Sequence, residues 1–212
     1  MSGENGIRIE VWSDYVCPFC YLELPELARL TRELPGAVEV TWRAFELRPE
    51  PEPTLDPDGD YLHRVWDASV YPMARERGMV LKLPPVQPRS RQAFEAAAFA
   101  REHGAFDAMH AALFRAFFEY GRDLADPDVL AELAVASGLD GAALRDALGT
   151  RRYTPEVMQD RRRALSLGIG GVPAMLLHGS GQRAVLLSGA QPYPVLKQQV
   201  EILRRVDMRA PA

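Results

Sequence analysis

The chain has 212 residues, of which 47% are apolar and 25% are charged, the composition of an ordinary globular protein. A formal net charge of −4 gives no electrostatic basis for binding nucleic acid or an anionic membrane. Residues 1–6 are polar, without the apolar segment of a secretory signal, and no apolar run approaches the ~20 residues that span a bilayer. We therefore expect a cytoplasmic protein without nucleic-acid or membrane partners.

The N-terminal part of the chain predicts a strand, a helix and a second strand. Apolar side chains occupy alternate positions of residues 7–12, which indicates a strand. Residues 24–34 have helical apolar spacing, and that helix should end at Pro35-Gly36. A second strand should follow from Val38. The acidic, proline-rich residues 49–59 favour neither element and are typical of a connector.

The central part of the chain predicts helices throughout residues 61–168. Asp126 and Asp140 are suitable N-caps, because their side-chain oxygens can accept hydrogen bonds from the first free N–H groups of a helix. Thr154, followed by a proline, is predicted to cap a third helix in the same way.

The C-terminal part returns to strands. Two short apolar runs, 174–178 and 184–187, are separated by Gly179-Ser180-Gly181, which is typical of a hairpin, and residues 192–205 predict a closing helix. The order β-α-β, helices, β-β-α indicates an α/β fold. We expect one domain from residues 1–50 and 168–212, interrupted by a helical insertion domain of residues 51–167.

The chain has two cysteines, Cys17 and Cys20, and they lie where the first strand pattern changes to the helix pattern. Pro18 suits the first helical position, so Cys17 falls at a helix N-terminus, where free N–H groups and the helix dipole favour a thiolate. Near a β-α-β pattern this spacing indicates a thioredoxin-like redox motif. Cys17 would attack, and Cys20, one turn further on, would resolve the mixed disulfide.

Two other interpretations of the cysteine pair remain open, a structural zinc half-site and two inert core thiols. A zinc site needs four ligands, and with no further cysteine it would have to recruit two of four histidines that lack the usual spacing. We therefore expect no metal.

A second motif, residues 168–173, precedes the apolar run at 174–178. Pro173 at the start of a strand has an ordinary structural interpretation. The alternative is a cis Val172–Pro173 peptide bond, which is uncommon and usually serves a purpose.

Four separated motifs together resemble the DsbA-family thioredoxin-fold oxidoreductases, and most of all their cytoplasmic, FrnE-like branch. The motifs are residues 13–21 (SDYVCPFCY), 42–49 (WRAFELRP), 168–173 (GIGGVP) and 188–192 (SGAQP). The resemblance implies a thioredoxin-like fold with a large all-α insertion. It also implies that Pro173 is a cis-proline facing the cysteines and that the Val172 backbone hydrogen-bonds a docked substrate strand. Further residues expected to shape the site are Asp14, Pro18 and Phe19.

The chain departs from the family pattern in two places. The Pro18-Phe19 dipeptide lacks the histidine of strongly oxidising members, which implies a milder potential. Related proteins often hold a buried acid at the position of Val11. Glu10 and Asp14 are the nearby candidates for proton transfer, each with the alternative of a solvated acid, and Asp14 has the better case because it belongs to a recognisable motif.

The leading hypothesis is a thiol–disulfide oxidoreductase that acts on protein or small-molecule substrates through a reversible Cys17–Cys20 disulfide. It would need no cofactor, although glutathione could be a co-substrate and glutathione or the thioredoxin system a redox partner, with the chain a monomer or a homodimer. One alternative is a glutathione-dependent small-molecule enzyme, similar to kappa-type transferases, hydroxychromene-carboxylate isomerases or tailoring enzymes of secondary metabolism. Another is a redox-regulated holdase.

Overall fold

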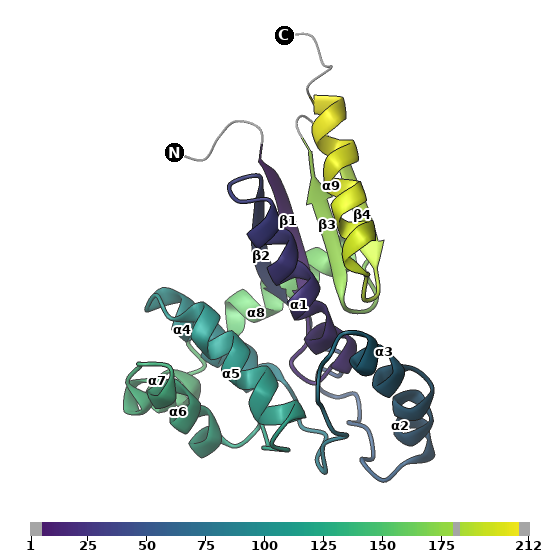
Figure 1. Cartoon of the computed structure of the whole chain (residues 1–212). Coiled ribbons are helices and arrows are strands. Elements are labelled where there is room, and N and C mark those ends of the chain that lie inside the picture. The colour runs from purple at the N-terminus through teal and green to yellow at the C-terminus, as the bar shows by residue number, and fades with distance from the viewer. Residues whose placement is uncertain (1–5, 180–182, 208–212) are drawn as a thin grey trace.

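The computed structural model describes residues 6–179 and 183–207, which form four strands and a larger set of helices (Figure 1). The strands are β1 (Ile7–Ser13), β2 (Val38–Ala44), β3 (Ala174–His178) and β4 (Ala184–Ser188). The helices are α1 (Pro18–Glu33), α2 (Asp60–Val65), a π-helical turn (Trp66–Val70), α3 (Tyr71–Glu76), α4 (Arg91–Glu102), α5 (Phe106–Phe118), α6 (Pro127–Ala136), α7 (Gly141–Gly149), α8 (Thr154–Ser166) and α9 (Tyr193–Asp207).

The four strands form one mixed sheet in the order β2-β1-β3-β4. β1 and β2 are parallel, while β3 runs antiparallel to both β1 and β4. Parallel neighbours need a crossover connection, which α1 supplies, and the antiparallel pair β3–β4 needs only a short turn. The predicted fold class and hairpin are confirmed, although the hairpin's turn at 179–181 lies partly outside the described residues.

Helices cover both faces of the sheet. Figure 1 shows α1 and α9 side by side over one face and α8 behind the other. The alternating apolar residues of β1 pack against α1 and α9 in one core cluster (Ile7, Ile9, Val11, Leu27, Leu30, Leu196, Val200). On the opposite face, Trp12 is fully buried and its indole N–H donates to the carbonyl of Asp160 in α8 at 3.1 Å.

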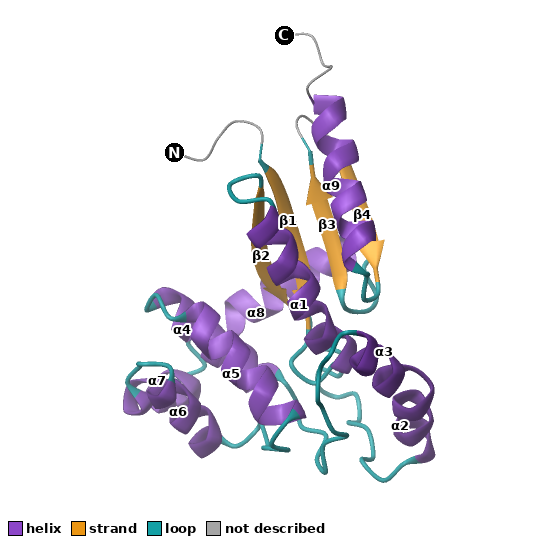
Figure 2. Ribbon diagram, in the orientation of Figure 1, coloured by secondary structure: helices purple, strands orange, loops and turns teal. Residues whose placement is uncertain are grey.

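The remaining helices gather beyond the end of the sheet at which β1 and β2 terminate (Figure 2). Their core is largely aromatic, and it continues into the start of α1. The ring of Tyr21 stacks on Phe114 and Phe118 of α5, with centroids 5.5 Å apart in both pairs. The prediction of separate sheet and helical domains stays a prediction, and the first turn of α1 packs against both parts.

Two local predictions were wrong. Residues 79–90 are not helical, because Pro84, Pro85 and Pro88 remove backbone donors and fix extended backbone around them. Thr154 is the first residue of α8 instead of its cap, and its hydroxyl donates to Glu95 of α4. The caps at Asp126 and Asp140 are confirmed, since each side chain accepts backbone N–H groups of its own helix. Within the described residues no helix is both long and apolar enough to cross a bilayer.

A buried ion pair joins α1 to the segment after α3. The guanidinium of Arg77 lies 3.1 Å from the carboxylate of Glu23, which is fully buried, and it also donates to the carbonyls of Leu22 and Gln191. Burial raises the pKa of Glu23 to about 7, although Arg77 opposes this rise. Because the folded-state pKa lies above the ordinary value, ionisation of Glu23 at rising pH weakens folding.

We expect Arg77→Ala to destabilise the protein more at pH 8 than at pH 5. At pH 8 the substitution leaves the ionised carboxylate of Glu23 buried without its cation, at a cost of about 3 kcal/mol or more, whereas at pH 5 Glu23 is protonated. Urea unfolding at both pH values measures the difference. Arg145→Ala, which breaks an exposed pair with Asp128, is the control and should change little at either pH. An equal loss for Arg77→Ala at both pH values would contradict the prediction.

Candidate active site

Cys17 is the N-cap residue of α1, with an extended backbone (φ −95°, ψ 113°) and Pro18 at the first helical position. Its carbonyl accepts the N–H groups of Cys20 and Tyr21 at 3.1 and 3.3 Å. The first turn of α1 contains no acidic side chain, and Cys17 lies at the positive end of the helix dipole. Reactive cysteines commonly occupy this position at a helix N-terminus.

Cys20 lies one turn further along α1 and is completely buried. The backbone N–H of Asp14 donates to its sulfur at 3.4 Å. Burial, and next the neighbouring Cys17 sulfur, raise the pKa of the Cys20 thiol well above its usual value. Both cysteines are free thiols, so the structure represents the dithiol form, in which Cys20 stays protonated.

The Val172–Pro173 peptide bond is cis and lies against the cysteine pair. The thiol of Cys17 donates to the carbonyl of Val172 at 3.5 Å. This contact joins residues 155 positions apart, and it brings the glycine-rich motif before β3 to the start of α1. Pro173 itself is buried beside them.

Cys17 lines a cavity of about 380 Å³. Cys17, Pro18, Phe19 and Val172 line it together, so the structure brings four of the seven predicted site residues to one surface. Cys20 and Pro173 lie behind this surface. The remaining walls come from elements outside the sheet: Leu47, which follows β2, Leu55 of the connector, Val65 and Trp66, Pro84 and Phe118.

Asp14 does not line the cavity, but it forms hydrogen bonds with two residues that do, Val16 and Leu47. Its carboxylate accepts the N–H of Val16 at 3.3 Å and the N–H of Leu47 at 2.7 Å. Asp14 is completely buried, and burial raises its pKa to about 6 against the opposing effect of these donors. Asp14 therefore fixes the turn before Cys17 against the start of the connector.

Glu10, the other candidate for proton transfer, points away from the cysteines. It lies on the α8 face of the sheet, paired with Arg43, Arg163 and His178 at 2.7–3.1 Å. Burial opposes ionisation of Glu10, but the hydrogen bonds from Arg163 and His178 and the charges of Arg163 and Arg43 outweigh it and lower its pKa to about 2. Such a carboxylate is a poor proton acceptor near neutral pH.

No sequence pattern indicated that the helical part contributes walls to the cavity. The connector at 49–59 and the proline-rich residues 84–88 were interpreted as a linker and as helix, yet both reach the cavity beside Cys17. The three prolines of residues 84–88 are the one local signal of an irregular segment there. Among the described residues no group of three or more His, Cys, Asp or Glu side chains is arranged to hold a metal ion.

A family model described as the DSBA-like thioredoxin domain matches residues 8–201. The chain belongs to this family. It is 38% identical over 176 residues to the uncharacterized protein YwbO of Bacillus subtilis, a match that covers 81% of this chain and 86% of the relative. The FrnE-like branch stays a prediction.

Solved structures of the DsbA-like family share the fold over almost the whole chain. A probable DsbA oxidoreductase, SCO1869 of Streptomyces coelicolor, is 29% identical with a TM-score of 0.79, covering 97% of this chain and 92% of its own. The cytosolic disulfide reductase DsbM of Pseudomonas aeruginosa, solved with GSH, is 22% identical with a TM-score of 0.68, covering 96% and 100%. Membership of the DsbA-like family makes Cys17 and Cys20 candidates for thiol–disulfide chemistry.

We expect iodoacetamide to alkylate Cys17 but not Cys20 in the folded, reduced protein. Cys17 lines the cavity, whereas Cys20 has no exposed surface and a raised pKa. A buried thiol with a raised pKa has less thiolate and less contact with the reagent, so Cys17 should be labelled clearly faster than Cys20 near pH 7. Mass spectrometry of digested samples taken over time measures both rates. Unfolding in urea should make the rates similar, and faster labelling of Cys20 in the folded protein would contradict this assignment.

Proposed function

We propose that this protein is a thiol–disulfide oxidoreductase that works through a reversible Cys17–Cys20 disulfide. The observation that carries the proposal is the asymmetry of the pair. Cys17 lies at a helix N-terminus and lines a cavity, and Cys20 is held as a buried thiol directly behind it. This is the arrangement that separates an attacking thiol from a resolving one.

The reaction proceeds in two exchanges. The Cys17 thiolate attacks a substrate disulfide, forms a mixed disulfide and releases the first substrate thiolate, which takes up a proton. Cys20, deprotonated, then attacks the Cys17 sulfur, releases the second substrate thiolate and closes the Cys17–Cys20 disulfide. One substrate disulfide is reduced while two protein thiols are oxidised, and the reverse sequence oxidises a substrate dithiol.

The cavity favours small disulfides as substrates. Its volume of about 380 Å³ is in the range of small-molecule sites, and its walls are mainly apolar, with Arg48, Glu52, Thr54 and Gln87 among the polar groups. Glutathione is the co-substrate we propose, in the cytoplasm, and the structural relative solved with GSH and titled a cytosolic disulfide reductase supports both choices. No resident cofactor is part of the proposal.

The Val172–Pro173 segment is proposed to position the substrate. Val172 lines the cavity and its carbonyl lies 3.5 Å from the Cys17 sulfur, so a bound disulfide must pass beside this backbone to reach Cys17. Phe19 and Pro18 form the adjoining wall on the α1 side. Specificity would then come from these residues together with the helical part.

The mainly apolar cavity also favours a second candidate, a glutathione-dependent enzyme that acts on a small molecule. In such an enzyme Cys17 would bind or activate glutathione, and no resolving thiol would be required. The two candidates therefore differ in their need for Cys20.

We expect Cys20→Ser to trap a mixed disulfide between Cys17 and glutathione when the reduced variant is mixed with glutathione disulfide. Without Cys20 the first exchange still occurs, but the second cannot. Intact-mass spectrometry should show one added glutathione per chain, while the unsubstituted protein should lose two hydrogens and retain no adduct.

Cys17→Ser is the matched control and should form no adduct under the same conditions. Adduct formation on Cys17→Ser, or a stable glutathione adduct on the unsubstituted protein, would contradict the two-cysteine mechanism. Undiminished glutathione-dependent turnover in Cys20→Ser would favour the second candidate.

We expect Val65→Trp to weaken the reaction with glutathione disulfide by filling the cavity. Val65 lines the cavity on the α2 side, away from the cysteine turn. The KM should rise roughly tenfold, which corresponds to about 1.4 kcal/mol of lost binding. Val65→Ile is the control and should keep a KM within about twofold, because the added group is small. An unchanged KM in Val65→Trp would place the substrate outside this cavity.

A further inference from the structure

The second exchange has a requirement that the proposed site residues do not meet. Cys20 must become a thiolate although it is completely buried and its pKa is raised. A buried anion is stable only where hydrogen-bond donors replace the water it has lost. The face of β1 that carries Val11 has no acid at that position, and Glu10 is engaged on the opposite face of the sheet.

Asp14 supplies one donor to the Cys20 sulfur, through its backbone N–H at 3.4 Å. Its carboxylate is not free to help, because the N–H groups of Val16 and Leu47 hold both oxygens. A second donor must therefore come from elsewhere around the sulfur.

The hydroxyl of Ser13 is the candidate for the second hydrogen-bond donor to the Cys20 sulfur. Ser13 ends β1 and is 4% exposed, and within the described part of the chain its buried oxygen makes no hydrogen bond in the dithiol state. Ser13 lies on the same face of β1 as Val11, the face that packs against α1, and the next residue, Asp14, contacts the Cys20 sulfur through its N–H at 3.4 Å. The Ser13 side chain acts to lower the pKa of the Cys20 thiol against the larger effect of burial. A buried hydroxyl without a partner destabilises the dithiol form, and it gains a strong acceptor as soon as Cys20 ionises.

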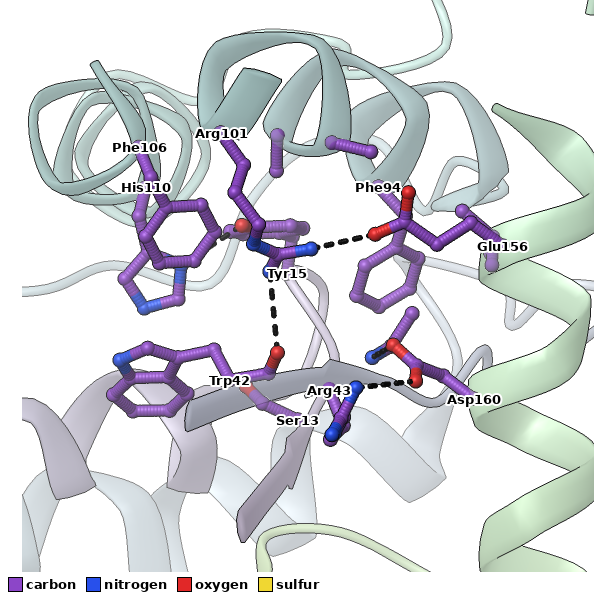
Figure 3. A pocket seen from close by; sticks show the side chains of 14 residues that line it. Ser13, Tyr15, Trp42, Arg43, Phe94, Arg101, Phe106, His110, Glu156 and Asp160 are labelled. Carbon is purple, nitrogen blue, oxygen red and sulfur yellow. Dashed lines mark hydrogen bonds and ion pairs between the residues drawn. The ribbon is translucent and has the colours of Figure 1, made fainter. Parts of the chain in front are cut away.

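Ser13 also borders a second, small cavity. This cavity measures about 20 Å³, enough for about one water molecule, and it lies between the ends of β1 and β2 and helices α4, α5 and α8 (Figure 3). Tyr15, Trp42, Arg101 and Glu156 line it together with Ser13, and the side chains of Arg101 and Glu156 are partly exposed.

We propose that Ser13 is a catalytic residue of the second exchange, in which its hydroxyl and the Asp14 N–H donate hydrogen bonds to the Cys20 thiolate. This inference rests on the proposed function. Cys20 releases its proton to solvent water, and the Cys20 thiolate attacks the Cys17 sulfur of the mixed disulfide. The Cys17–substrate S–S bond breaks, the substrate thiolate leaves with the electron pair and takes a proton from solvent, and the Cys17–Cys20 bond forms.

Rapid mixing of the reduced protein with excess dithiobis(nitrobenzoate) separates the two exchanges. This aromatic disulfide releases one coloured thiolate when Cys17 attacks and a second when Cys20 resolves the mixed disulfide. We expect Ser13→Ala and Ser13→Val to leave the first phase unchanged and to slow the second about tenfold or more, the loss of one hydrogen bond to a charged group. Ser13→Thr, which has the shape of valine but keeps the hydroxyl, should restore the second phase.

Thermal unfolding of the reduced variants provides the structural control. Removing a hydroxyl that has no partner in the dithiol form should not lower the unfolding temperature of Ser13→Ala, so a slow second phase in a fully stable variant is the signature of a catalytic role. Alanine is smaller than serine, so Ser13→Ala should fold without steric conflict. If the valine variant does not fold, the rate of the second phase in Ser13→Ala is sufficient to test the role of Ser13.

Equal second-phase rates in Ser13→Thr and Ser13→Val, or an unslowed second phase in Ser13→Ala, would overturn the role of Ser13 and leave the proposed function intact. Absence of a Cys17–Cys20 disulfide after the reaction of the unsubstituted protein would overturn the proposed function and this inference with it. The two failures are therefore distinguishable.

Discussion

The buried carboxylate of Asp14 is the constraint on which the site depends. One oxygen accepts the N–H of Val16 and the other accepts the N–H of Leu47, while the backbone N–H of the same residue donates to the Cys20 sulfur. A buried carboxylate is tolerated only when donors surround it, so these contacts hold one another in place. They fix the turn that presents Cys17 and the start of the connector that forms the wall facing it.

Reactivity and access at Cys17 have separate origins in the chain. The position of Cys17 at a helix N-terminus is set by a few residues around Pro18, which begin α1 directly after the cysteine. Access comes from segments far away in sequence, since residues of the connector, the π-helical turn and α5 enclose the cavity. The aromatic contacts of Tyr21 with α5 join the two, because they pack the first turn of α1 directly onto the helical core.

Local patterns predicted the features that local physics determines. The alternation at 7–12, the caps at Asp126 and Asp140 and the hairpin strands depend on neighbouring residues, and the structure confirms them. The cavity walls depend on long-range packing that no short pattern encodes. Residues 79–90 illustrate the limit, because their prolines reveal an irregular segment but do not indicate that it lies beside Cys17. The free hydroxyl of Ser13 was equally invisible, since its meaning comes from what surrounds it.

The asymmetry of the cysteine pair restricts the partner that regenerates the enzyme as well as its substrate. Once the Cys17–Cys20 disulfide has formed, Cys20 remains inside the core, so an incoming thiolate can reach only the Cys17 sulfur, and only through the cavity. A small thiol can enter a cavity of about 380 Å³, whereas a folded protein can insert no more than a narrow loop. Under the proposed function, the limited size of this cavity therefore favours glutathione over the thioredoxin system as the reductant, and the two half-reactions would share one binding surface.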